Sequence, residues 1–311
     1  MGEIHRCVET LPVWWDRFQT NIHAYLIKGK KNAVVDTGAP GTSIGTVLES
    51  FGLSLPDIDF ALNTHGHSDH IGGNAALKSA GAKLMIHRME VDFIEDQSKA
   101  FDRFVYPLAK ALGGESGAAE EKKAFLKDMA PELKVDRKLE DNDLIDLGGD
   151  IELRVVHLPG HSAGSAGFYF EREGILFAGD SAPGLGTPGG SLPILYDLEA
   201  YEASLGRLTE MEPQCILSAH PYRGVNLAPS IVKKKGEVKQ FLSDSLDAAR
   251  RIREAIDHQA AKGSDRPLDE ITDAVIAELP VKMGFNPLTE VPVPRFPIGT
   301  VFWGLQEKRG K

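Results

Sequence analysis

Residues 64–70 read Thr-His-Gly-His-Ser-Asp-His and crowd metal-ligating side chains into one short segment. The ligating residues are His65, His67, Asp69 and His70. Imidazole and carboxylate groups this close together are stabilised when a cation shares their lone pairs, and they suit zinc, iron or manganese. The H-x-H-x-D-H order is far more specific than a single pair of histidines. The motif therefore indicates a metal site rather than a solvated His-rich loop.

Four other apolar runs, each interpreted as a buried strand, lead into a carboxylate or an imidazole. In chain order, the residues that follow these runs are Asp36, His161, Asp180 and His220. A loop at the end of a strand can carry a functional side chain without disturbing the core. Each of these residues alone is as readily a turn residue. Five motifs in this order predict one composite site.

Together these motifs resemble those of the metallo-β-lactamase-fold hydrolases, and the resemblance covers about residues 1–230. It implies an α/β fold, a four-layer αββα sandwich with a two-metal site at one edge between its sheets. The two implied sets of metal ligands are His65, His67 and His161, and Asp69, His70 and His220. Asp180 is implied to bridge the metals, and Asp36 to orient their ligands by hydrogen bonding.

The chemistry that the resemblance implies is hydrolysis by a dinuclear metal centre. Two divalent cations, with zinc favoured and iron or manganese open, would share a water and lower its pKa toward neutrality. The resulting bridging hydroxide would attack the carbonyl of a thioester, lactone or ester. Asp69 and Asp36 are the candidate catalytic carboxylates, with Asp69 assigned to proton handling beside the metals.

Other functions stay open: a mononuclear-iron oxidoreductase resembling persulfide dioxygenases, a metal-dependent ribonuclease, and a non-catalytic metal-binding module. The net charge is −10 at pH 7, and 14 basic against 12 acidic residues at 231–311 leave the whole negative excess in residues 1–230. An acidic catalytic region repels a polyanion, which favours a small acyl substrate over nucleic acid. The complete ligand set disfavours the non-catalytic module. The lysine run at 233–235 is interpreted as a solvated face.

Length and composition favour one large domain and one smaller one, at residues 1–229 and 230–311. No apolar run is long enough to span a bilayer, and the N-terminal residues lack the apolar stretch of a signal peptide. Cys7 and Cys215 lie far apart, so we expect no disulfide framework, and Cys215 is interpreted as a buried thiol. We expect a cytoplasmic protein that does not bind membranes, and leave open a homo-oligomer.

Two segments depart from the minimal pattern of the family. Residues 89–138 show helical apolar spacing, interrupted at the glycines of 113–117, and we expect a helical insertion. It either packs on the core or caps the metal site with its aromatic side chains, and we favour the cap. Residues 230–311 predict further helices, whose layout resembles the winged-helix-like C-terminal region of the β-lactamase-like-protein-2 branch.

Four aromatic residues are candidates for contact with the substrate. Tyr222 stands two residues after His220, as in glyoxalase-II-like thioesterases, but residues 181–190 lack the lysine that those enzymes carry. Pro183 occupies the position of a tyrosine found in quorum-quenching lactonases. Trp14 and Trp15 lie near the first predicted hairpin, at 21–36, and Phe104 lies in the insertion. Apolar aromatic groups here favour an apolar acyl substrate, although packing explains them equally well.

Overall fold

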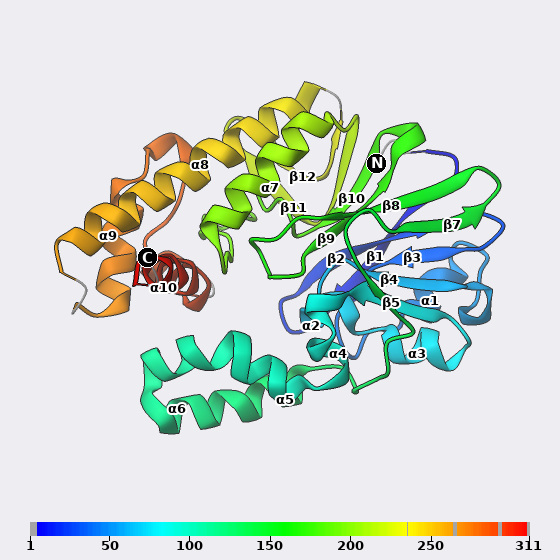
Figure 1. The fold of residues 1–311 in the computed structure, drawn as a ribbon, viewed down its shortest axis with the longest axis horizontal. Helices are drawn as coiled ribbons and strands as arrows, with labels where there is room; N and C mark the ends of the chain where they lie inside the picture. Colours follow the sequence, from blue (N-terminus) through cyan, green and yellow to red (C-terminus); the bar gives the residue numbers. More distant parts are fainter. Residues whose placement is uncertain (1–4, 235, 264–265, 292–293, 310–311) are drawn as a thin grey trace. The chain divides into compact units, whose positions relative to one another are not determined.

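The computed structural model describes residues 5–234, 236–263, 266–291 and 294–309 (Figure 1). Residues 1–4 lie outside the described part, and with them part of the N-terminal stretch used to argue against a signal peptide. The chain divides into two compact units. The first comprises Met1–His157 with Ala166–Arg172, and the second Leu158–Ser165 with Glu173–Lys311. The division into domains at residue 229 stays a prediction.

The first unit contains a six-stranded mixed sheet. Its strands in spatial order are β1 (Val8–Trp15), β2 (Thr20–Ile27), β3 (Ala33–Val35), β4 (Phe60–Asn63), β5 (Lys83–His87) and β6 (Arg137–Leu139). β1 to β3 pair antiparallel, which confirms the predicted hairpin, and β3 to β6 pair parallel. β3 and β4 are buried along their whole length, as parallel strands covered on both faces are.

Short helices connect the parallel strands of this sheet. They are α1 (Ile44–Glu49), the 3-10 turn η1 (Leu55–Asp57), α2 (Ser68–Ile71), α3 (Asn74–Ser79) and the 3-10 turn η2 (Arg88–Glu90). Ser43 caps α1, since its hydroxyl accepts the backbone N–H of Thr46 at 3.2 Å. Leu48 of α1 and Leu77 of α3 pack into one core with Leu84 of β5. This packing fixes the loops that follow the parallel strands.

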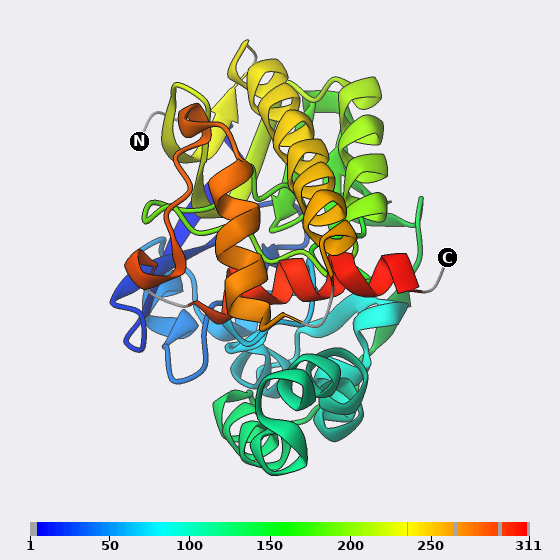
Figure 2. The same ribbon diagram turned by 90° about the vertical axis from the view of Figure 1, so that its left-hand side faces the viewer.

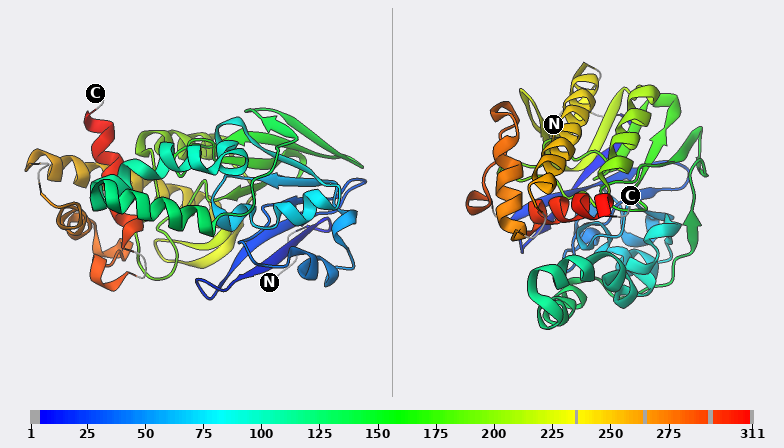
Figure 3. Two further views of the ribbon diagram at one scale, coloured as in Figure 1. Left: turned by 90° about the horizontal axis from the view of Figure 1, so that it is seen from below. Right: turned by 60° about the vertical axis from the view of Figure 1, so that its left-hand side comes forward.

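The predicted insertion is helical in the structure. Its elements are α4 (Asp92–Glu95), α5 (Gln97–Ala100), the five-residue π-helical segment η3 (Phe101–Val105) and α6 (Tyr106–Asp128). Gly114, with φ 62° and ψ −165°, breaks α6 into two arms, as the run of glycines predicts. Figures 1 and 3 show the two arms folded back beside each other. Three antiparallel strands follow in this unit: β7 (Leu144–Gly148), β8 (Ile151–His157) and β9 (Ala166–Phe170).

The second unit begins its regular structure with β10 (Ile175–Gly179), which pairs parallel to β11 (Cys215–Gly224) through the crossover helix α7 (Leu198–Met211). β12 (Leu227–Lys234) completes an antiparallel hairpin with β11. The second six-stranded sheet has the order β12-β11-β10-β9-β8-β7.

The regular structure that follows β12 in the second unit is helical. The helices are α8 (Gly236–Ala261), α9 (Leu268–Glu278) and α10 (Arg295–Arg309), with the short 3-10 turns η5 (Val281–Met283) and η6 (Leu288–Glu290) between the last two. Figure 2 shows α10 crossing α8 and α9. The sequence therefore predicts correctly that this region is helical.

Two interpretations from the sequence are wrong in detail. Lys233 is buried, with 2% of its surface exposed, and is not part of a solvated face; Lys235 of the same run lies outside the described residues. The Nζ of Lys233 donates to the carbonyl of Tyr222 on the neighbouring strand β11 and to that of Ser230 on its own strand β12. The run before His220 does not end there, because β11 continues to Gly224 with irregular pairing between Leu217 and Tyr222.

Two other expectations agree with the structure. Cys7 and Cys215 are buried thiols rather than a disulfide, and burial raises the pKa of Cys215 to about 11. A thiol with that pKa is protonated at neutral pH and inert as a nucleophile. In the part of the chain that the structure describes, none of the helices has the length and apolar character needed to cross a membrane.

Candidate metal centre

The His-rich motif forms the loop between β4 and α2. His67 has extended backbone and precedes the first turn of α2, which carries Asp69 and His70. Gly66 packs so closely on the insertion that a Cβ there would overlap the Cβ of Phe93. Its N–H donates to the Glu90 carboxylate at 3.0 Å. Packing on one side and a buried acceptor on the other therefore fix the loop that presents both histidines.

Asp36 organises the motif from the end of β3. Its carboxylate accepts the Thr64 N–H at 2.8 Å, the Thr64 hydroxyl at 2.9 Å and the Nδ1–H of His70 at 2.8 Å. Asp36 has φ 57°, a left-handed conformation that is uncommon outside glycine and concentrates at functional sites. Since His70 donates from Nδ1, its Nε2 is left with the lone pair that a metal requires.

The rings of the motif are crowded and buried. The ring centroids of His65 and His70 are 4.0 Å apart, and those of His65 and His67 are 4.6 Å apart. His65 is 1% exposed and His70 is 0% exposed, so bulk water does not reach the nitrogens of either ring to form hydrogen bonds. Thr64 Oγ1 lies 3.2 Å from Nδ1 of His65, which links this ring to Asp36 through one hydroxyl.

In the second unit, Asp180 lies beside two histidines. It follows Gly179 at the end of β10, where φ 51° turns the chain out of the strand. Asp180 Oδ2 is 3.7 Å from Nε2 of His161 and 3.4 Å from Nε2 of His220. His161 donates its Nδ1–H to the carbonyl of Ile194 at 2.8 Å, so its Nε2 keeps the lone pair on the side of Asp180. Both distances are longer than those of strong hydrogen bonds, so a cation could be held between the carboxylate oxygen and the two imidazole nitrogens.

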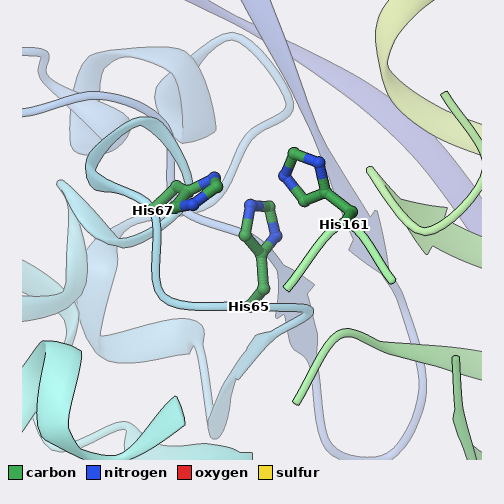
Figure 4. A group of neighbouring side chains, drawn as sticks. All are labelled: His65, His67 and His161. Carbon is green, nitrogen blue, oxygen red and sulfur yellow. The ribbon is translucent and has the colours of Figure 1, made fainter. Parts of the chain in front are cut away.

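Three groups of side chains have ligand atoms that all lie within 4.8 Å of one another. The first is His65, His67 and His161 (Figure 4). The other two are His65, His70 and Asp180, and Asp69, His70 and His220. The first and third groups coincide with the two ligand sets that the family resemblance implies, and Asp180 joins the second group. The donor chemistry, neutral imidazole with carboxylate, fits divalent metal ions.

The candidate substrate residues differ in their surroundings. Tyr222 is 5% exposed, with its ring centroid 5.7 Å from that of His220. Phe104 is half-buried and stacks on Phe93 at 5.1 Å. Trp14 is 45% exposed and donates its indole N–H to Asp16 in the turn between β1 and β2. Trp15 meets the edge of Phe18.

Phe93 connects the insertion with the loop between β4 and α2 that carries His65 and His67, here called the metal loop. Its ring lies 6.0 Å from that of His67, edge to face, and nearly parallel to that of Phe104. The guanidinium of Arg103 lies 4.8 Å from the ring centroid of Phe104. These contacts all lie within the first unit, and they make a continuous aromatic path from a candidate metal ligand to the π-helical segment.

Several residues that shape the site escape sequence reasoning. Glu90 is fully buried and binds Gly66, and Ile194 supplies only a backbone carbonyl to His161. The spacing of the sequence does not distinguish Ile194 from its neighbours. For Glu90 one weak signal exists, since it is an acidic residue three positions after β5. The rings of His87 and His157 stack with centroids 4.2 Å apart, and neither residue joins a ligand group found among the described residues. Burial, and then the charge of His157, lower the pKa of His87 to about 4, so it stays neutral at pH 7.

Known proteins with similar sequences point to one family. The profile of the metallo-β-lactamase superfamily matches residues 17–220. A beta-lactamase-like protein 2 homolog of Caenorhabditis elegans is 23% identical over 83% of this chain and 72% of its own length. A hydroxyacylglutathione hydrolase of Methylococcus capsulatus is 27% identical over 62% of this chain and 59% of its own. The acyl-coenzyme A thioesterase MBLAC2 of Gallus gallus is 30% identical over 50% of this chain and 56% of its own. The chain thus spans little more than half of the last two relatives.

Solved structures agree on the fold. A metallo-β-lactamase family protein of Thermus thermophilus aligns with a TM-score of 0.72 at 22% identity, over 99% of this chain and 95% of that one. A beta-lactamase domain protein of Burkholderia ambifaria aligns with a TM-score of 0.66 at 18% identity, over 99% and 89%. The predicted fold class is therefore confirmed, and the relatives named as hydrolase and thioesterase confirm the prediction of a hydrolase of this family. The chain belongs to the metallo-β-lactamase superfamily.

Proposed function

We propose that the chain is a dinuclear metal-dependent hydrolase of small acyl compounds, with thioesters as the first substrate class. The observation that carries the proposal is the coincidence of two ligand groups with Asp180, whose Oδ2 faces Nε2 of both His161 and His220. Relatives named hydroxyacylglutathione hydrolase and acyl-coenzyme A thioesterase support a thioester over a lactone or an ester. The acidic character of residues 1–230 supports a small substrate over nucleic acid.

The donors suit two cations of the zinc class. One group offers three imidazole nitrogens and the other a carboxylate with two imidazoles, and tetrahedral zinc sites use both kinds of donor set. Two such cations would lower the pKa of a shared water toward neutrality and polarise an acyl carbonyl. Asp180 is the carboxylate proposed to bridge them.

The chain's own residues have separate tasks in this proposal. Asp36 holds His70 in the tautomer whose Nε2 can bind metal. Asp69, with its Oδ2 3.6 Å from Nε2 of His70 and 13% of its side chain exposed, binds metal and is the group that takes and returns a proton. Phe104 and Tyr222 are proposed to contact the acyl group, and Trp14 and Trp15 remain weaker candidates for such contact.

The test combines metal content with turnover. Purified full-length protein is expected to contain about two zinc ions per chain and to hydrolyse members of an acyl-thioester panel. Asp180→Asn keeps the size of the side chain but removes the bridging charge, so both zinc content and turnover should fall. Asp244→Asn is the matched control, because Asp244 is a buried carboxylate of the same unit that binds the backbone N–H of Val225.

The outcomes separate the candidate functions. Unchanged zinc content and turnover in Asp180→Asn would contradict the bridging role. One iron per chain, with consumption of persulfide and no thioester hydrolysis, would replace the proposal by the mononuclear-iron oxidoreductase. Release of nucleotides from RNA without thioester hydrolysis would replace it by the ribonuclease. Bound metal without turnover of any of these substrates would replace it by the non-catalytic metal-binding module.

A further inference from the structure

We propose that α10 positions the metal ligand His161 through one connecting segment, with Thr300 as the main positioning residue. The connecting segment is defined as residues 193–198, which precede and begin α7. All the residues of this argument belong to the second unit. The inference rests on the proposed metal site, and it assigns to a helix far along the chain the task of orienting one ligand of that site.

The connecting segment holds the loop of His161 at two points. The carbonyl of Ile194 accepts the Nδ1–H of His161 at 2.8 Å. The backbone N–H groups of Tyr196 and Asp197 both donate to the carbonyl of Gly160, at 2.8 and 3.1 Å. The ring and the backbone just before it are thus both tied to this segment. A shift of the segment must therefore turn the His161 ring.

Thr300 fixes the same segment from the other side. It is 0% exposed, and its hydroxyl donates to the carbonyl of Pro193 at 2.6 Å while accepting the N–H of Leu195 at 3.1 Å. These two backbone groups flank Ile194. One buried side chain therefore holds both peptide planes that meet at Ile194, and one of these planes contains the carbonyl that accepts from His161.

Two further residues of α10 extend this contact along one helix face. Trp303 packs its ring against that of Tyr196, with centroids 5.7 Å apart, and Glu307 accepts the N–H of Leu198 at 2.6 Å. Positions 300, 303 and 307 have the spacing of residues on one side of a helix. Gly304 lies beside this face, where a Cβ would press on Ile256 of α8 at 2.8 Å and on Leu198 at 3.1 Å. The absence of a side chain there lets α10 approach the segment closely.

The consequence for metal binding follows from the tautomer of His161. With Nδ1 donating to Ile194, the ring presents Nε2 as an acceptor toward Asp180. Without the Thr300 hydroxyl, the Leu195 N–H and the Pro193 carbonyl would be buried without these hydrogen bonds, which costs free energy. Movement of the connecting segment toward other partners lowers this cost. The Ile194 carbonyl then leaves His161, and its ring is free to take the other tautomer.

The experiment compares three full-length variants with the wild type. Thr300→Val keeps the shape of the side chain and removes both hydrogen bonds, and Thr300→Ser restores the hydroxyl. Thr272→Val is the matched control: Thr272 is also 0% exposed, lies in α9, and donates to the Leu268 carbonyl in its own helix. Zinc affinity is measured by competition with a chromogenic chelator. The tautomer of His161 is read in the metal-free protein from long-range proton–nitrogen NMR correlations.

We expect Thr300→Val to lose about 10-fold in zinc affinity, as partners of ligating histidines typically do when changed, and to lose the Nδ1–H tautomer of His161. Thr300→Ser and Thr272→Val should keep both. Wild-type zinc affinity and tautomer in Thr300→Val would overturn the inference, as would equal losses in Thr272→Val. If Thr300→Val does not fold, Glu307→Ala serves instead, with the same tautomer shift expected and an unchanged tautomer overturning the inference. Absence of zinc binding by the wild type would contradict the proposed function alone, because the tautomer test needs no metal.

Discussion

Asp36 offers the sharpest test of how the first unit prepares its metal ligands. In Asp36→Asn, the oxygen that accepts the Thr64 N–H can be retained, while an NH2 group replaces Oδ2. Oδ2 is the oxygen that accepts Nδ1–H of His70 at 2.8 Å and the Thr64 hydroxyl at 2.9 Å. The new NH2 would face two donors, so the variant loses at least one charge-assisted hydrogen bond in a fully buried place.

The size of the effect follows from that bond. A hydrogen bond to a charged group contributes about 1.5–3 kcal/mol, and this loss falls on a ligand rather than on the fold as a whole. At about 1.36 kcal/mol per factor of ten, zinc affinity should drop by about 10- to 150-fold. A change of His70 to its other tautomer would move the proton to Nε2, the nitrogen that must bind metal. This effect points to the upper half of the range.

The assay is chelator competition for zinc together with thermal unfolding of the metal-free protein. Asp136→Asn is the control, since Asp136 is also a carboxylate of the first unit that accepts a backbone N–H, that of Leu84 at 2.8 Å. The control should lose stability without losing zinc affinity. If Asp36→Asn binds zinc within about twofold of wild type, the charge of Asp36 does not orient His70 and the reasoning fails.

Three more predictions test other parts of the structure. Phe104→Ala should reduce kcat/KM for long acyl chains more than for short ones at constant zinc content, whereas a lower Tm with an unaltered chain-length profile would make Phe104 a packing residue, whose loss costs roughly 3–5 kcal/mol. Gly66→Ala should displace the metal loop, because its Cβ overlaps Phe93, and lower zinc affinity; zinc binding and Tm equal to wild type would contradict the observed contact. Burial lowers the pKa of Lys233 from 10.5 to about 8. Between these pH values the unfolded chain therefore binds more protons than the folded chain. The free energy of unfolding of the wild type, relative to Lys233→Met, should rise with pH in that window by up to about 3 kcal/mol. Urea unfolding at about pH 7.5 and about pH 10.5 measures this difference, and a difference that stays constant or falls with pH would refute the assignment.

Local patterns in the sequence predict the first half of the site well. β2 and β3 form the hairpin predicted at 21–36, and the H-x-H-x-D-H motif lies on the loop and first helical turn that follow β4. These features depend on alternation, capping and spacing within a few residues, which a sequence displays directly. The glycines at 113–117 likewise predict the break in α6.

Long-range contacts explain what the sequence could not reveal. Lys233 lies in a basic run that is typical of a solvated face, yet its ammonium group is enclosed by two backbone carbonyls and the ring of Phe241. Thr300 contacts Leu195 across 105 residues, and neither residue belongs to a recognisable motif. Buried polar groups find their partners only when the chain has folded. Their roles are therefore properties of packing and cannot be read from spacing.

Phe93 and Phe104 stack on each other but should differ in how readily they tolerate substitution. Phe93 contacts the His67 ring and occupies the space that a side chain on Gly66 would need, so a change there disturbs the metal loop. Phe104 touches Phe93 and Arg103 from a half-buried position one layer farther out. Drift of acyl preference in descendants of this chain should therefore begin at Phe104 and along η3, where substitutions leave the metal loop intact. Changes at Phe93 should become tolerable only together with a compensating change at Gly66, because His67 must keep its role as a proposed ligand.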